Sequence, residues 1–142
     1  MHMSKEVDYG LRAMIVIATV KEGLLTSKEI SQKFEIPYNF LSLILPKLVR
    51  AGLVVSTQGP KGGYRLGREP VQINFLQIIE AIDGPVDVID CNTPGACRLD
   101  SFCGMVEVWG KFKANIESYF SGITLDRFVS QTFSADPCQK CQ

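Results

Sequence analysis

A chain of 142 residues with 46% hydrophobic side chains is long enough for one ordinary domain with a real core. Its apolar stretch over residues 13–20 is too short to cross a membrane, and no signal-peptide pattern is present, so we expect a cytoplasmic protein with no membrane partner. The net charge is zero, but residues 1–68 carry ten Lys and Arg against five Asp and Glu, and residues 69–142 carry five against ten. The segment 36–68 has five basic residues and no acidic one, which favours a polyanion such as nucleic acid over a chance block of one sign.

Helical spacing and capping residues predict three helices in the first half of the chain, over residues 8–23, 26–34 and 38–52. Gly23 is the expected stop of the first helix. The second helix opens with a capping box, in which Thr26 and Glu29 each bond the other's backbone N–H. Pro37 separates the second helix from the third, and Gly52 ends the third. Two short helices around a tight turn indicate a helix-turn-helix motif.

A β-hairpin is predicted over residues 53–67, directly after the third helix. β-Branched residues favour a strand over 53–57, Gly and Pro favour a turn over 58–63, and residues 64–67 form the returning strand. Lys61 lies at the tip, and the two glycines after it would let the backbone approach a partner closely. This pattern is typical of the wing of a winged helix, although a hairpin that only closes the core is the alternative.

The second half of the chain predicts a capped helix over 74–84, a cysteine-bearing loop, a long helix over 105–120 and a short helix over 124–130. The long helix carries one apolar stripe: Met105, Val108, Trp109, Phe112, Ile116, Tyr119 and Phe120. Such a stripe forms either core or a dimer interface. We favour the interface, because a regulator that binds a palindrome must be a dimer.

These elements predict a mainly α protein built as a winged helix-turn-helix. We expect the DNA-binding domain over residues 1–84, the cysteine-bearing loop over 85–104, a long dimerisation helix with a short C-terminal helix over 105–132, and a mobile tail over 133–142.

Three cysteines, Cys91, Cys97 and Cys103, are spaced six residues apart in the loop. Thiolates are soft ligands that suit iron–sulfur clusters. A structural zinc site more often uses tight C-x-x-C pairs, and a thiol switch without metal is the third possibility. The tail pair Cys138 and Cys141 forms a C-x-x-C whose role stays unassigned.

Four stretches, "DYGLRAM", "EIPYNFLSLIL", "KLVRAGLV" and "GPKGGYRLG", together with the spaced cysteines resemble the bacterial winged-helix regulators that include IscR and NsrR. The resemblance covers about residues 3–132. It implies a homodimer that binds a palindromic operator in double-stranded DNA and senses redox, nitric oxide or iron–sulfur status. It also implies one iron–sulfur cluster per protomer, with [4Fe–4S] favoured over [2Fe–2S], and neither an enzyme activity nor a small-molecule substrate.

Three thiolates leave one ligand position open, and the resemblance suggests how it is filled. IscR-like proteins use a histidine three residues after the last cysteine, where this chain has Val106. NsrR-like proteins use an aspartate before the aromatic residue of the first helix, supplied by the partner protomer, and this chain has Asp8 before Tyr9. Asp8 is therefore the expected fourth ligand. The alternatives are an ordinary role for Asp8 as an N-cap or as a first-turn charge favoured by the helix dipole, or ligation by Glu6 or Glu107.

We expect DNA contacts from the start of the second helix, the third helix and the wing: Ser27, Lys28, Tyr38, Asn39, Ser42, Lys47, Lys61, Gly62, Gly63, Tyr64 and Arg65. Asn39 is suited to bind adenine with two hydrogen bonds, and Leu43 to contact a thymine methyl group. Pro46 removes one backbone hydrogen bond and is expected to kink the third helix. Gln58 stands where relatives often have an arginine, which predicts weaker recognition of the minor groove.

Overall fold

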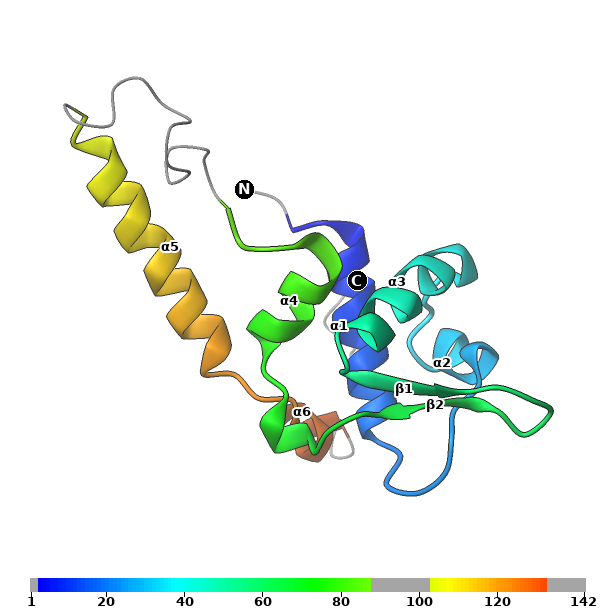
Figure 1. Cartoon of the computed structure of the whole chain (residues 1–142). Coiled ribbons are helices and arrows are strands. Elements are labelled where there is room, and N and C mark those ends of the chain that lie inside the picture. Colours follow the sequence, from blue (N-terminus) through cyan, green and yellow to red (C-terminus); the bar gives the residue numbers. More distant parts are fainter. Residues whose placement is uncertain (1–2, 88–102, 133–142) are drawn as a thin grey trace.

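A computed structural model describes residues 3–87 and 103–132 (Figure 1). In chain order its elements are α1 (Lys5–Ala18), α2 (Ser27–Lys33), α3 (Tyr38–Arg50), β1 (Val54–Thr57), β2 (Gly63–Leu66), the 3-10 turn η1 (Pro70–Gln72), α4 (Phe75–Asp83), α5 (Met105–Ser121) and α6 (Asp126–Thr132). The predicted class, mainly α with a winged helix-turn-helix, is confirmed. No helix in the described part is long and apolar enough to cross a membrane. Most of the cysteine-bearing loop and the tail after residue 132 lie outside the described residues, so the predictions made for them stay predictions.

The first helix begins and ends earlier than the sequence predicts. Ser4 is its N-cap and accepts a hydrogen bond from the Val7 N–H at 3.1 Å. The helix ends at Ala18, and Gly23 lies in the following turn with φ +94°, so the prediction that Gly23 stops the helix was wrong. The reason is tertiary: after α1 the chain turns to bring Leu25 into an antiparallel bridge with Tyr64 of β2.

The helix-turn-helix forms as predicted. The Thr26 N–H donates to the Glu29 carboxylate at 2.8 Å, and the Glu29 N–H donates to the Thr26 hydroxyl at 3.3 Å, which completes the capping box of α2. Gly52 follows α3 with φ +73°, a backbone conformation in which glycine avoids a Cβ clash, so it ends the helix as predicted. Pro46 lies inside α3, and the kink expected there stays a prediction.

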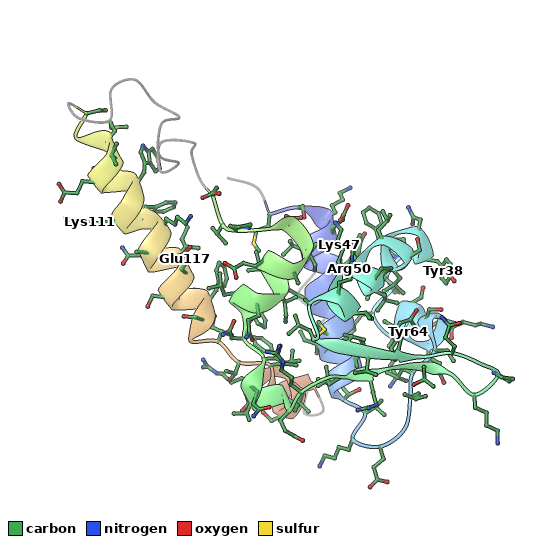
Figure 2. All side chains as sticks on the ribbon, viewed as in Figure 1. Tyr38, Lys47, Arg50, Tyr64, Lys111 and Glu117 are labelled. Carbon is green, nitrogen blue, oxygen red and sulfur yellow. The ribbon has the colours of Figure 1, made fainter. Side chains whose placement is uncertain are left out.

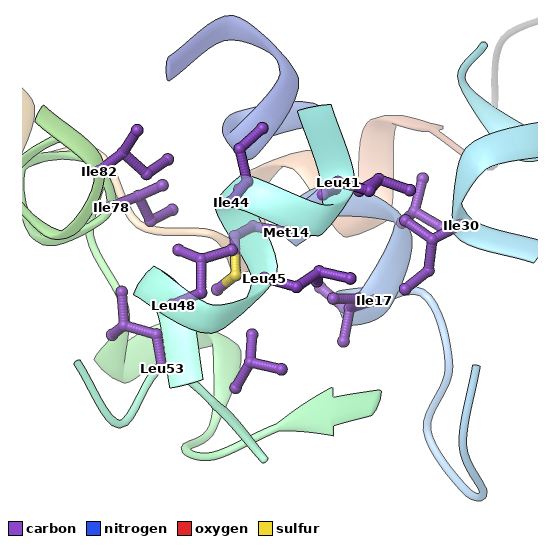
Figure 3. Packing of buried hydrophobic residues seen from close by; sticks show 14 of the residues in the cluster. Met14, Ile17, Ile30, Leu41, Ile44, Leu45, Leu48, Leu53, Ile78 and Ile82 are labelled. Atoms are coloured by element: carbon purple, nitrogen blue, oxygen red, sulfur yellow. The ribbon is translucent and has the colours of Figure 1, made fainter. Parts of the chain in front are cut away.

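The core is made by α1, α3 and α4, which pack against one another (Figure 3). Met14 and Ile17 of α1 belong to the same buried cluster as Ile44, Leu45 and Leu48 of α3. Gly10 makes the close approach of α1 and α4 possible, since a Cβ at that position would collide with the Ile82 side chain. Helix α3, the second helix of the helix-turn-helix motif and so the expected recognition helix, is thus fixed on its inner side by apolar contacts from α1 and α4.

The long helix α5 packs against α4 and otherwise extends away from the body of the molecule (Figure 1). None of its residues is buried. After α5 the chain returns to the core through Leu125, which is fully buried, and Phe128 of α6 stacks on Phe75 of α4 with ring centroids 4.8 Å apart. The length predicted for α5, residues 105–120, is correct to within one residue.

Candidate nucleic-acid interface and metal ligands

The exposed side of α3 carries the residues predicted to contact bases. Tyr38 is 63% exposed and Leu43 54% exposed, and both Asn39 and Ser42 are exposed as well. The Ser42 hydroxyl donates to the Asn39 carbonyl at 2.8 Å, which leaves its oxygen free to accept. The opposite side of the helix is held in the core by Leu41, Ile44, Leu45 and Leu48. The helix therefore presents a fixed, mostly uncharged surface of the kind that enters a major groove.

Lys47 does not belong to this exposed surface. Its ammonium donates to a carboxylate oxygen of Glu6 at 2.6 Å and to the carbonyl oxygen of Ile82 at 3.1 Å. The side chain is about one-third exposed, and both of its partners lie on other helices. Lys47 thus takes part in helix packing, and the DNA contact predicted for it stays a prediction. The sequence analysis did not anticipate this ion pair, because the carboxylate is 41 residues away and local pattern cannot place it beside Lys47.

Arg50 is the cation that the sequence analysis missed on α3. It is exposed, and within residues 3–87 and 103–132 it makes no ion pair. It follows Asn39 by eleven residues, about three helical turns, and so lies on the same side of α3. The sequence already contained this spacing, from which Arg50 could have been placed on the same side of the helix as Asn39.

The wing places Lys61 in the exposed turn between its strands, but it gives its glycines another role. A Cβ on Gly63 would lie 2.7 Å from the Leu25 carbonyl oxygen, and a Cβ on Gly62 would collide with the Thr57 carbonyl. Gly63 is also buried. The close backbone approach that these glycines allow is therefore within the chain, at the turn and at the bridge to Leu25.

Tyr64 and Arg65 lie on opposite faces of the hairpin, because successive residues of a strand alternate. Tyr64 pairs with Ser56 and contributes to a hollow beside α3, while Arg65 pairs with Val55 and lines a different hollow with Lys21. At the start of α2, Lys28 is exposed and Ser27 is half-buried. The structure thus brings Tyr64 beside the recognition helix and directs Arg65 to the far face of the hairpin.

Of the three spaced cysteines, only Cys103 is among the described residues. It is a half-buried free thiol two residues before α5. Cys91 and Cys97 lie outside the described residues, as do Cys138 and Cys141. Within the part of the chain that the structure describes, no three His, Cys, Asp or Glu side chains gather as metal ligands.

Asp8 is exposed on the first turns of α1 and pairs with Arg12, with 2.8 Å between a carboxylate oxygen and a guanidinium nitrogen. Ser4, not Asp8, is the N-cap, but Asp8 lies in the first turn of α1, where the helix dipole favours a negative charge, so that form of the alternative remains open. The two weaker candidates for the fourth ligand also form ion pairs: Glu6 with Lys47, and Glu107 with Lys111 at 2.6 Å.

The first turn of α1 and the start of α5 stand well apart in the same chain (Figure 1). These two places carry Asp8 and Cys103, the described members of the predicted ligand set. Nothing in the described part of one protomer brings these two side chains together.

Comparison with known proteins gives a consistent result. Residues 3–131 match the model of the Rrf2 family, described as an iron-dependent transcriptional regulator. The transcriptional regulator IscR of Aliivibrio salmonicida is 33% identical over 130 residues, which cover 91% of this chain and 77% of that protein. Two solved structures are similar at 29% identity. T. potens IscR has a TM-score of 0.76, and the match covers 98% of this chain and 93% of that protein. B. subtilis CymR, described as the global cysteine regulator, has a TM-score of 0.73, and the match covers 92% of this chain and 98% of that protein.

Proposed function

The chain belongs to the Rrf2 family of transcriptional regulators, and we propose that it binds a palindromic operator as a homodimer and adjusts this binding through an iron–sulfur cluster. The proposed ligands are Cys91, Cys97 and Cys103 of one protomer and Asp8 of the partner protomer. The observation that carries the proposal is the set of three equally spaced cysteines next to α5 in a chain with this family's fold.

The donor set fits such a cluster chemically. Thiolates are the ligands that iron–sulfur clusters prefer, and Cys103 is a free thiol that is partly accessible. Asp8 is exposed, and its partner Arg12 is itself exposed, so the carboxylate is available to a second protomer. The separation of Asp8 from Cys103 within one chain supports ligation across a dimer (Figure 1). By resemblance to NsrR-like proteins, [4Fe–4S] is favoured over [2Fe–2S].

The dimer is proposed to form through α5. Its apolar stripe leaves Val108 58% exposed and Tyr119 67% exposed, and Met105 and Phe112 are exposed as well. An apolar helix face of this extent, left open by the chain's own fold, is typical of a protein–protein interface. Pairing of two such helices would place the start of each α5 near another protomer.

A bound cluster would supply a link that oxidation or nitric oxide can break. With a cluster bound, Asp8 of one protomer and Cys103 of the other would hold α1 and α5 of different protomers together. Without it, Asp8 would pair with Arg12 as in this structure, and the two α3 helices would be free to change their spacing. A coupling of about 1–3 kcal/mol between the two sites would change DNA affinity by about 5- to 150-fold.

The test is anaerobic purification followed by absorption and Mössbauer spectroscopy and by iron and sulfide assay. Cys91→Ala, Cys97→Ala and Cys103→Ala should each remove the iron chromophore and leave a folded dimer. Ser101→Ala, in the same segment, is the matched control and should keep its iron. If all three cysteine variants retain iron, the ligand assignment is wrong.

A regulator whose cysteines oxidise directly, without iron, is the second candidate. The likeness to CymR proteins, one of which has been solved in an oxidized form, favours it, as does the free thiol of Cys103. The same assay separates the two. Protein that contains no iron or sulfide after anaerobic purification and reconstitution, but changes its DNA affinity on mild oxidation, would support the thiol switch.

A further inference from the structure

A hollow of about 300 Å³ lies between the C-terminal half of α3 and the β-hairpin. It is lined by Pro46, Val49 and Arg50 of α3 and by Ser56 and Tyr64 of the hairpin. We call it the helix–wing groove. Figure 2 shows two of these residues, with Arg50 near the end of α3 and Tyr64 on the hairpin below it.

The polar groups around the helix–wing groove all suit an anion. Arg50 brings five N–H donors and a permanent positive charge. Ser56 and Tyr64 are register partners in the sheet, so their side chains lie on the same face of the hairpin and each adds a hydroxyl. No acidic residue lines the groove, and in the described part of the chain Arg50 has no ion pair that would neutralise it.

The position of the groove favours one kind of anion. It is continuous with the exposed side of α3 through Pro46 and Arg50, and its other wall is the hairpin that leads to Lys61. A winged helix places its recognition helix in a major groove and its wing toward the neighbouring groove, so one DNA strand must cross between them. The backbone of that strand would pass over the groove. Contacts to backbone phosphates fix the protein on the duplex without reading sequence.

We propose that the helix–wing groove binds a phosphodiester of the DNA backbone, with Arg50 as the charged contact and the hydroxyls of Ser56 and Tyr64 as further donors. The proposal deepens the DNA-binding function of the family and is independent of the cluster. Arg50 takes the place on α3 that the sequence gave to Lys47, whose ammonium is already bonded to Glu6 and Ile82.

A second hollow, of about 720 Å³, provides the contrast. It is lined by cations, Lys21, Arg65 and Arg68, but also by Glu69, and it lies on the other face of the hairpin from α3. Lys21 lies in the loop after α1, is exposed and makes no ion pair among the described residues, so it matches Arg50 in charge and exposure but not in position. Arg68 offers no such contrast, because its guanidinium lies 3.7 Å from where a Cβ on Gly52 would stand, at the C-terminal end of α3.

The experiment measures the affinity of the full-length protein for operator DNA and for random DNA over a range of salt concentrations. Arg50→Gln should weaken the affinities for operator and for random DNA by a similar factor, about tenfold. It should also lower the slope of log affinity against log salt concentration by about one. Arg50→Lys should keep the slope and lose part of the affinity. Ser56→Ala and Tyr64→Phe should each weaken binding to both DNAs by a smaller factor, and Lys21→Gln should leave the salt slope unchanged.

Several outcomes would overturn the proposal. An unchanged slope for Arg50→Gln in a folded protein, or an equal loss for Lys21→Gln, would show that the groove makes no specific contact to a DNA phosphate. Competition by millimolar inorganic phosphate at constant ionic strength, lost in Arg50→Gln, would assign the groove to a free anion. If Arg50→Gln fails to fold, Arg50→Lys, Ser56→Ala and Tyr64→Phe decide by the same criteria. Failure of the wild type to prefer operator over random DNA would instead contradict the proposed function.

Discussion

Lys47 of the recognition helix lies 2.6 Å from Glu6 in the first turn of α1, measured from Nζ to Oε2. The same ammonium donates to the carbonyl of Ile82 in the last turn of α4. Glu6 is two residues before Asp8, and α4 leads into the segment that carries Cys91. One side chain therefore connects the recognition helix to the two parts of the chain that lead to the proposed ligands.

Lys47→Met should lower the free energy of unfolding by about 1 kcal/mol, because Glu6 and the Ile82 carbonyl lose a charged donor while the alkyl stem still packs. It should also narrow the difference in DNA affinity between cluster-loaded and cluster-free protein. Urea unfolding and fluorescence anisotropy measure the two effects. Lys61→Met, an exposed lysine without an ion pair in the described residues, is the control for stability. Unchanged stability with an equal loss of affinity in both states would instead make Lys47 a phosphate contact, as the sequence predicted.

Lys47 also shows where prediction from sequence ends. The helix starts at Thr26 and Asn74 follow from capping boxes, which depend on side chains three residues apart, and both were predicted correctly. The partner of Lys47 and the bridge from Leu25 to Tyr64 join residues far apart in the chain. Local periodicity carries no information on such pairs, so the predicted end of α1 was wrong and the ion pair of Lys47 was not predicted.

The separation of base contacts from backbone contacts can be tested on the recognition helix and the wing. Asn39→Ala should cost about 1–3 kcal/mol on the operator and relax specificity at one base pair, since Asn39 is exposed on the first turns of α3. Lys61→Ala should weaken binding to all DNA sequences alike and lower the salt slope of the affinity by about one. Affinities for operator, single-substituted operators and random DNA distinguish the two. Equal losses on operator and random DNA for Asn39→Ala would refute its role at a base.

The proposed dimer interface predicts a charge-sensitive face on α5. Val108→Glu should shift the protein toward monomer by at least about tenfold in dissociation constant, because a buried unpaired carboxylate costs several kcal/mol. Ala114→Glu changes an exposed residue on the other side of the same helix and should leave the dimer intact. Sedimentation equilibrium gives the result. Circular dichroism should be the same for both variants, and equal dissociation by both would reject the assignment of this face.

The capping box of α2 predicts a pH-dependent contribution to stability. The pKa of Glu29 is lowered from its ordinary value of 4.5, mainly because its carboxylate accepts a hydrogen bond from the Thr26 N–H. A lowered pKa in the folded state means that the ionised form stabilises the fold above pH 4.5, and that this contribution is lost as the pH falls through the folded pKa. The stability difference between wild type and Glu29→Gln should therefore shrink on acidification from pH 7 to pH 3 in urea titrations. Glu22→Gln, at an exposed position, is the control, and a difference that stays constant would contradict the prediction.

Asp8 gives the most direct test of ligation across the dimer. Among the described residues its carboxylate pairs only with Arg12, and both side chains are about half exposed, so the pair stabilises the fold by about 0.5 kcal/mol or less. Asp8→Ala should therefore leave the stability of cluster-free protein nearly unchanged.

The same variant should make the cluster more labile to oxygen, alter its absorption spectrum, and weaken the link between cluster state and DNA affinity. The reason is that the open ligand position has no substitute at Val106. Glu107→Ala is the matched control, because it also removes an exposed carboxylate paired with a basic residue four positions on. If Glu107→Ala alters the spectrum and Asp8→Ala does not, the fourth ligand lies at the start of α5, and the cluster does not connect α1 of one protomer with α5 of the other.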